Sequence, residues 1–373
     1  RRSMTLKELN IVNFKNIGEA TLAFCSGFNC FIGNNGVGKT NVLDAIYQLS
    51  MCKSFFNVSD SQNIRHGEPF FVLQGKYERQ EGEDIDIYCG VKRGQKKVFR
   101  KNQKIYDKLS EHIGLLPLVM ISPEDVALIE GGSEGRRRLI DGIISQCDRD
   151  YMYRLIRYNK ALMQRNMLLK NTAGKIPEAD VIEIWDEQLA DHGEEILKKR
   201  RQFLDEFKVV FQQYYELISS GKEKVVLEYN SSVKVENVCE ALRENLARDA
   251  VLGYTTVGIH RDDLTMKIDG YDVKKIGSQG QKKTFLIALK LAQYVWLYRI
   301  SGVKLLLLLD DIFDKLDAGR VQQIIHLVGG DIFGQVFITD TNRGHVDKML
   351  MSQHKDYSLF RVEDGIFVNF ADN

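Results

Sequence analysis

The chain has 373 residues, of which 44% are hydrophobic, and this length favours two lobes over one hydrophobic core. The densest apolar run, residues 305–309, is too short to cross a bilayer, so we expect no membrane partner. The net charge of +1 does not indicate a nucleic-acid partner, and six scattered cysteines without a Cys-x-x-Cys pair argue against disulfides or zinc and favour the cytoplasm.

A glycine-rich segment follows the first predicted strands. Residues 5–32 alternate apolar and polar side chains as strands do, and residues 33–40 then read Gly-Asn-Asn-Gly-Val-Gly-Lys-Thr before a helical pattern. Such a loop binds triphosphates because its N–H groups line a concavity at the positive end of the helix. We expect Lys39 to contact the β- and γ-phosphates and Thr40 to bind Mg²⁺. The predicted ATP-binding residues of this loop are Gly33, Asn34, Asn35, Gly36, Gly38, Lys39, Thr40 and Asn41.

The rest of the chain changes from strands to helices and back. Residues 70–98 have a strand pattern, and Ser-Pro-Glu-Asp at residues 122–125 is typical of a helix start. The predicted elements that follow are helices 149–171 and 181–218, strands 225–229 and 264–268, helix 283–299, strand 303–309, helix 320–328, strand 335–339, helix 344–351 and strands 357–361 and 366–370. We therefore expect an α/β fold, with residues 4–122 and 303–373 in an ATP-binding lobe and residues 123–302 in a mainly helical lobe.

Two aspartates end the apolar strand 303–309. A strand that is apolar at every position is typical of the centre of a covered parallel sheet, which presents its ligands at the carboxyl end. We expect Asp310 to bind Mg²⁺ together with Thr40, and Asp311 to polarise the attacking water as general base. Lys39 and Asp311 are thus the predicted catalytic residues. The alternative is an acidic turn after a strand.

The sequence Ser278-Gln-Gly-Gln precedes the predicted helix 283–299. Ser-Gly turns are common, but at this place the segment matches the signature loop of ATP-binding-cassette (ABC) ATPases. In that family the signature loop of one subunit caps the γ-phosphate held by the other. The match implies an ATP-dependent homodimer in which Ser278, Gly280 and Gln281 bind ATP.

Taken together, the motifs resemble the RecF family of SMC/Rad50-like ATPases, from about Thr5 onward. The matching blocks are residues 13–16, 33–41, 53–55, 64–67, 122–125, 135–141, 258–264, 278–281 and 309–312. The resemblance implies an ABC-type P-loop ATPase head (Rad50-like) with ATP and Mg²⁺ as cofactors, which binds DNA and acts as a weak, switch-like ATPase. It also implies that RecR-like and RecO-like mediators help it to load recombinase at single-strand gaps. By position, Lys15 and Asn16 would bind ATP and Arg65 would lie near it, whereas residues 258–264 would support the site, the dimer seam or simply a structural turn.

Two departures from the cassette pattern predict slow hydrolysis. Asp311 stands where transporter ATPases have glutamate, and Thr-Asp-Thr-Asn at residues 339–342 stands where they have a switch histidine. The alternative reading, an ABC transporter ATPase subunit, would normally keep that histidine.

Basic residues are concentrated between residues 92 and 108. A charge run is often only a solvated face, but in Rad50-like heads this region would belong to the face that meets DNA. Sparse aromatic residues favour contact with the backbone of a duplex over stacking on a single strand. The candidate DNA-binding residues are Lys92, Arg93, Lys96, Lys97, Arg100, Lys101 and Lys104.

Overall fold

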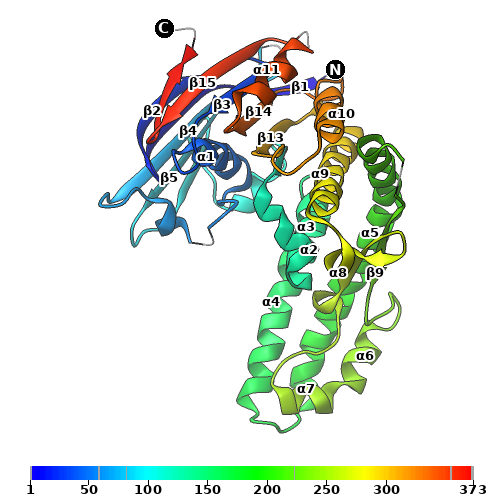
Figure 1. Cartoon of the computed structure of the whole chain (residues 1–373). Helices are drawn as coiled ribbons and strands as arrows, with labels where there is room; N and C mark the ends of the chain where they lie inside the picture. Colours follow the sequence, from blue (N-terminus) through cyan, green and yellow to red (C-terminus); the bar gives the residue numbers. More distant parts are fainter. Residues whose placement is uncertain (1, 58, 81, 222, 353–354, 371–373) are drawn as a thin grey trace. The chain divides into compact units, whose positions relative to one another are not determined.

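The computed structural model describes residues 2–57, 59–80, 82–221, 223–352 and 355–370, and the chain forms two compact units (Figure 1). Unit 1 comprises Arg1–Asp125, Leu217–Gly221 and Ser278–Asn373, and unit 2 comprises Val126–Glu216 and Lys222–Gly277. The units differ from the predicted lobes chiefly at residues 278–302, which fall in unit 1. The reason is the burial of α9 (Gln279–Ser301), in which every residue from 284 to 297 is buried.

Unit 1 is built on two β-sheets. One sheet has the order β12-β1-β4-β5-β6-β7 with β2 paired to β1, and the other has the order β16-β15-β3-β14-β13-β8. The second sheet is parallel except for β16. The strands of the first sheet are β1 (Arg2–Phe14), β2 (Ile17–Ala23), β4 (Phe70–Arg79), β5 (Asp84–Lys92), β6 (Val98–Lys101), β7 (Lys104–Ile105) and β12 (Val303–Lys304). Those of the second are β3 (Phe28–Ile32), β8 (Leu118–Ile121), β13 (Leu306–Asp310), β14 (Val336–Asp340), β15 (Tyr357–Glu363) and β16 (Ile366–Asn369).

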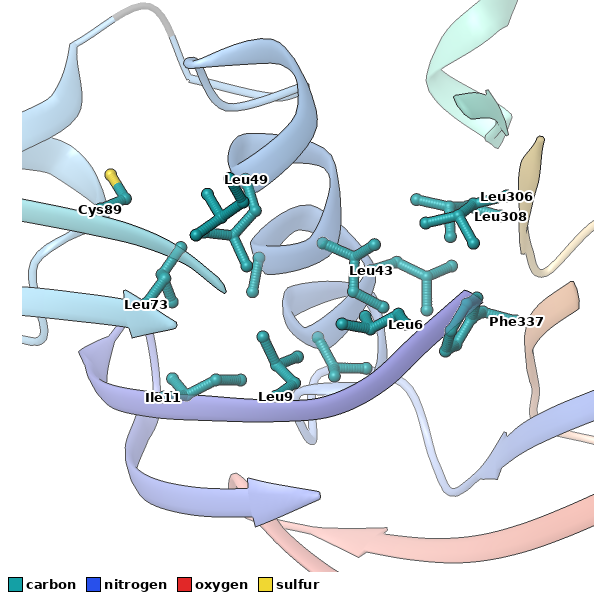
Figure 2. Close-up of a cluster of buried hydrophobic side chains, with 14 of the residues drawn as sticks. Leu6, Leu9, Ile11, Leu43, Leu49, Leu73, Cys89, Leu306, Leu308 and Phe337 are labelled. Carbon is teal, nitrogen blue, oxygen red and sulfur yellow. The ribbon is translucent and has the colours of Figure 1, made fainter. Parts of the chain in front are cut away.

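Helix α1 (Lys39–Met51) packs against strands of both sheets. Figure 2 shows Leu43 and Leu49 of this helix among Leu9 of β1, Leu73 of β4 and Leu308 of β13, all with no exposed surface. Burial of a leucine side chain stabilises the fold by about 1.5–3 kcal/mol. The loop before α1 is therefore attached to a helix that the core holds on two sides.

The predicted strand 303–309 is two strands in the structure. β12 pairs with β1 in the first sheet, and β13 pairs with β14 and β8 in the second. The break falls at Leu305, whose carbonyl accepts a hydrogen bond from the Tyr294 hydroxyl at 3.1 Å. One apolar run thus connects the two sheets and ends at Asp310, the predicted Mg²⁺ ligand, and Asp311, the predicted general base.

The remaining described helices of unit 1 are α10 (Ala318–Val328), α11 (Arg343–Met351), the short helices Asp60–Asn63 and Leu109–Glu111, and all but the last residue of the short helix Pro123–Val126. Unit 2 is mainly helical and contains the three-stranded sheet β11-β10-β9. Its elements are α2 (Ala127–Glu130), α3 (Ser133–Ser145), α4 (Arg149–Asn171), most of α5 (Ala179–Ser219), β9 (Val225–Asn230), α6 (Val238–Glu244), α7 (Leu246–Leu252), the short helix Ile259–Arg261, β10 (Asp263–Ile268), β11 (Tyr271–Asp272) and α8 (Val273–Ile276). Among the described residues, no helix is both long and apolar enough to span a bilayer.

Candidate nucleotide site

The glycine-rich loop connects the carboxyl end of β3 to the first turn of α1. Gly36 and Gly38 have φ angles of +80° and +109°, which favour glycine because L side chains rarely adopt them. A Cβ atom at Gly38 would lie 2.7 Å from the Asn16 side-chain oxygen. Both the backbone conformation and the close approach therefore require glycine at position 38.

Lys39 is folded across its own loop. Its Nζ donates a hydrogen bond to the Gly33 carbonyl at 2.6 Å, and the residue is only 5% exposed. Burial lowers the pKa of Lys39, and three neighbouring aspartates oppose that change. These aspartates, which favour the charged ammonium, are Asp310, Asp311 and Asp340.

Two side-chain oxygens predicted to bind Mg²⁺ lie next to each other. The Thr40 hydroxyl donates to Asp310 Oδ1 at 2.9 Å, and the Thr339 hydroxyl donates to the same oxygen at 2.6 Å. A hydroxyl and a carboxylate are the oxygen ligands that Mg²⁺ prefers, usually with phosphates and waters completing the shell. Within the described part of the chain, no group of three or more His, Cys, Asp or Glu side chains is arranged to hold a metal. The Thr40 hydroxyl and the Asp310 carboxylate fit a Mg²⁺ ion bound together with a nucleotide.

Asp311 lies in a strained turn directly after β13. Its φ is +47°, and its N–H donates to the Thr339 carbonyl at 3.1 Å. Burial and then the nearby Asp340 raise the pKa of Asp311, whereas Lys39 and Lys283 lower it. A carboxyl with a raised pKa is a better proton acceptor, as a general base requires.

The loop and the aspartates face one cavity of about 220 Å³. Its lining residues are Asn35, Gly36, Gly38, Lys39, Thr40, Asn41, Pro123, Asp310, Asp311 and Thr339. The structure therefore brings together residues that are some 270 positions apart in the chain, as in the pair Thr40 and Asp310. Asn34 lies on the exposed part of the loop, and Gly33 contributes the carbonyl that accepts from Lys39.

A larger hollow of about 690 Å³ lies beside this cavity. It is lined by Lys15, Asn16, Ser61, Gln62, Ile64, Arg65, His66 and Arg93. Asn16, which lines the hollow, accepts a hydrogen bond at 2.8 Å from Asn41, which lines the cavity. The sequence pointed to Lys15, Asn16 and Arg65 but not to Ser61 or Gln62, because a short polar segment between strands carries no recognisable pattern.

The signature-like segment forms a helix cap in this chain. The Ser278 hydroxyl accepts from the Gln281 N–H at 3.1 Å, and the Gln281 side chain accepts from the Ser278 N–H at 2.8 Å. Arg320 donates to the Gly280 carbonyl at 3.3 Å. Ser278, Gly280 and Gln281 are absent from the residues that line the phosphate-loop cavity among those the structure describes.

The basic run 92–104 divides into exposed and engaged side chains. Lys97 donates to the Cys52 carbonyl at 2.5 Å and to Asp60 at 2.9 Å, which leaves its ammonium unavailable for phosphate contact. Arg100 lies over the Tyr88 ring at 4.6 Å. Lys101 is half-buried, and the exposed members of the run are Lys92, Arg93, Lys96 and Lys104.

Two of the matching blocks, residues 135–141 and 258–264, meet within unit 2. Arg136 forms an ion pair with Asp263 at 2.7 Å, and Arg200 pairs with Asp141 at 2.9 Å and Asp262 at 3.7 Å. Arg200 belongs to a second basic run, Lys-Lys-Arg-Arg at residues 198–201, and is 2% exposed, so it cannot reach a phosphate backbone. These pairs support the structural interpretation of residues 258–264.

The chain matches the family model for the RecF/RecN/SMC N terminal domain over residues 5–367. It is 53% identical to the DNA replication and repair protein RecF of Phocaeicola vulgatus over 97% of each chain, and 47% identical to that of Flavobacterium johnsoniae over 96% of this chain and all of the relative. The solved structure of the recombination mediator RecF with ATP has a TM-score of 0.88 at 34% identity, covering 99% of this chain and 100% of the other. An Smc head domain from Pyrococcus furiosus, 16% identical with a TM-score of 0.57 and covering 98% and 96%, shares the fold.

The predicted RecF resemblance and the ABC-type ATPase head are thereby confirmed. The similarity extends over nearly the whole of both chains, so it includes unit 2 as well as the nucleotide-binding unit. The chain belongs to the RecF family.

Proposed function

We propose that the protein is an ATP-dependent DNA-binding protein of recombinational repair that dimerises when it binds ATP and hydrolyses ATP slowly. The single observation that carries the proposal is the cavity that unites Lys39, Thr40, Asp310 and Asp311 while the signature residues lie outside it. Membership of the RecF family supports the repair role, and the solved relative, described as RecF-ATP in the RecFOR pathway, supports ATP as the nucleotide.

Each residue of the cavity has a role in binding and hydrolysis. ATP would supply the phosphoanhydride bond, and Mg²⁺ would neutralise charge on the phosphates. Lys39 would exchange the Gly33 carbonyl for phosphate oxygens, and Thr40 and Asp310 would supply oxygen ligands to Mg²⁺. The Asp311 carboxylate would accept a proton from the attacking water.

The end of β14 supports slow turnover. Asp340, 2% exposed, lies where cassette transporters place the switch histidine, and its carboxylate cannot donate to a γ-phosphate. The His345 imidazole lies against this carboxylate, with its Nδ1 at 3.1 Å from Asp340 Oδ2. We expect a steady-state turnover well below the enzyme median of about 10 s⁻¹. A phosphate-release assay that gives tens per second would contradict this reasoning.

Dimerisation would complete the site in trans. Because Ser278, Gly280 and Gln281 lie outside the cavity of their own chain, we propose that they cap ATP bound to a second copy. The test is light scattering on a sizing column with and without Mg-ATP, for the wild type, Ser278→Arg and the exposed control Glu83→Arg. We expect a dimer with ATP in the wild type and the control but not in Ser278→Arg. A monomer throughout, or a dimer that persists in Ser278→Arg, would refute the arrangement.

The proposed DNA contact uses the exposed lysines of the run 92–104. Their exposed ammonium groups can contact the phosphate backbone of DNA; the three lysines are Lys92, Lys96 and Lys104. Contact with the backbone predicts binding that is insensitive to DNA sequence and weakened by salt. RecR-like and RecO-like mediators and recombinase loading complete the proposed role, and the RecFOR pathway of the solved relative supports them. The transporter alternative is not favoured, since the chain belongs to the RecF family.

A further inference from the structure

Helix α1 carries a buried carboxylate that has no role in phosphate binding as described above. Asp44 has no exposed surface. Its Oδ2 accepts from Lys15 Nζ and from the Ser54 hydroxyl, each at 2.6 Å, and its Oδ1 accepts from the Phe55 N–H at 2.7 Å. A buried charge is costly unless it is paired and hydrogen-bonded, so this carboxylate favours one arrangement of the three segments that it joins.

The segment that Lys15 brings to Asp44 is the turn between β1 and β2. Asn13 and Lys15 have φ angles of +54° and +53°, a left-handed conformation that is unfavourable for residues other than glycine. The Lys15 N–H donates to the Asn63 carbonyl at 2.7 Å, and its Nζ lies 4.8 Å from the centre of the Phe56 ring. The ion pair with Asp44 is therefore one of the contacts that hold a strained turn.

The next residue of the turn, Asn16, reaches the phosphate loop. Its side-chain oxygen accepts a hydrogen bond from the Asn41 side chain at 2.8 Å. A Cβ atom added to Gly38 would lie 2.7 Å from the same oxygen. Lys15 and Asn16 also line the hollow beside the phosphate-loop cavity, together with Arg65. A ligand whose phosphates occupy the cavity would place its remaining part in this hollow.

We propose that Asp44 is a positioning residue for the nucleoside part of ATP, because it fixes Lys15 and thereby holds Asn16 and the wall of the hollow in place. The proposal rests on the ATP binding proposed above. It also changes the role expected for Lys15, whose ammonium is neutralised by Asp44 and serves to hold the turn rather than to bind phosphate.

The test compares two ligands that share the triphosphate but differ in the nucleoside. Dissociation constants of Mg-ATP and of Mg-tripolyphosphate are measured by calorimetry for three full-length proteins, the wild type, Asp44→Asn and Lys15→Met. Lys15→Arg keeps a cation for Asp44 and should restore the wild-type preference. Ser50→Ala is the matched control, since the Ser50 hydroxyl is also buried on α1 but donates to the Leu116 carbonyl, away from the turn.

We expect Asp44→Asn and Lys15→Met to weaken ATP binding by roughly tenfold or more while tripolyphosphate binding changes by less than about threefold. If Asp44→Asn does not fold, as circular dichroism would show, Lys15→Met alone decides. Equal weakening of both ligands would mean that the pair only supports the phosphate loop, and unchanged constants would mean that it has no part in binding; either result overturns the proposal. Failure of the wild type and Ser50→Ala to bind ATP at all would instead overturn the proposed ATP binding, and this inference with it.

Discussion

Arg165 is the residue whose loss should damage unit 2 most. It is fully buried on α4, and it donates to Asp186 and Asp249 at 2.7 Å each, to the Thr255 hydroxyl at 2.9 Å and to the Leu242 carbonyl at 3.4 Å. Replacing it with methionine keeps an unbranched apolar stem but leaves two buried carboxylates without their cation. Breaking a buried pair in this way costs about 3–5 kcal/mol. Burial already raises the pKa of Asp186, so protonation of that group limits the cost, and we expect a loss of about 4 kcal/mol.

The two tryptophans of the chain allow the loss to be assigned to a unit. Trp185 lies in unit 2 and Trp296 in unit 1, so in a Trp296→Phe background the fluorescence reports on unit 2. Urea unfolding of Arg165→Met is compared with Arg154→Met, whose partners Asp150 and Asp191 have side chains that are 59% and 70% exposed. The control should lose less than about 1 kcal/mol. If Arg165→Met loses no more than the control, the assignment of Arg165 as the electrostatic centre of unit 2 is refuted.

Three further predictions concern unit 1. Lys96→Met should weaken duplex binding and reduce the slope of log affinity against log salt concentration by about 1, because Lys96 is exposed. Lys97→Met should leave that slope unchanged and lower the thermal stability instead, because Lys97 is held by Cys52 and Asp60. The reversed pattern in a salt titration would contradict the assignment. Gly38→Ala should reduce ATP affinity by roughly tenfold or more, because its Cβ meets a neighbouring amide, and Gly36→Ala, which has open space, should show a smaller effect in the same titration. Burial lowers the pKa of His112 from 6.5 to about 4, so the folded state favours the neutral imidazole. The stability that the neutral imidazole contributes is therefore lost as the pH falls from about 6.5 towards 4. The loss should be about 1 kcal/mol at pH 5.5 relative to pH 7.5 and absent in His112→Gln, and equal pH dependence in both proteins would show that His112 is not responsible.

Local patterns predicted the parts of this fold whose signals are short in sequence. The long helices expected at residues 149–171 and 181–218 are α4 and α5, and the glycine-rich loop lies between a strand and a helix as its sequence indicates. These signals work because capping, apolar periodicity and the φ angles of glycine act over a few residues. The aspartates at 310 and 311 were identifiable for the same reason, since an apolar run followed by carboxylates is a local feature.

Only the tertiary structure decided what each of these residues contacts. The sequence cannot distinguish Lys96 from Lys97, yet one is exposed and the other is held by Cys52 and Asp60. In the sequence Asp44 is an ordinary polar residue of a predicted helix, and only the structure shows that it pairs with Lys15 of a distant turn. The apolar run 303–309 likewise gives no sign that it divides between two sheets. Its first part pairs with β1, at the other end of the chain, and its second part pairs with β14, and neither pairing can be deduced from the run itself. The phosphate loop is specified within eight consecutive residues, so the sequence alone predicted the residue types of the candidate site. Burial and charge pairing depend on segments distant in the chain, so only the fold determined which side chains are exposed and which are engaged.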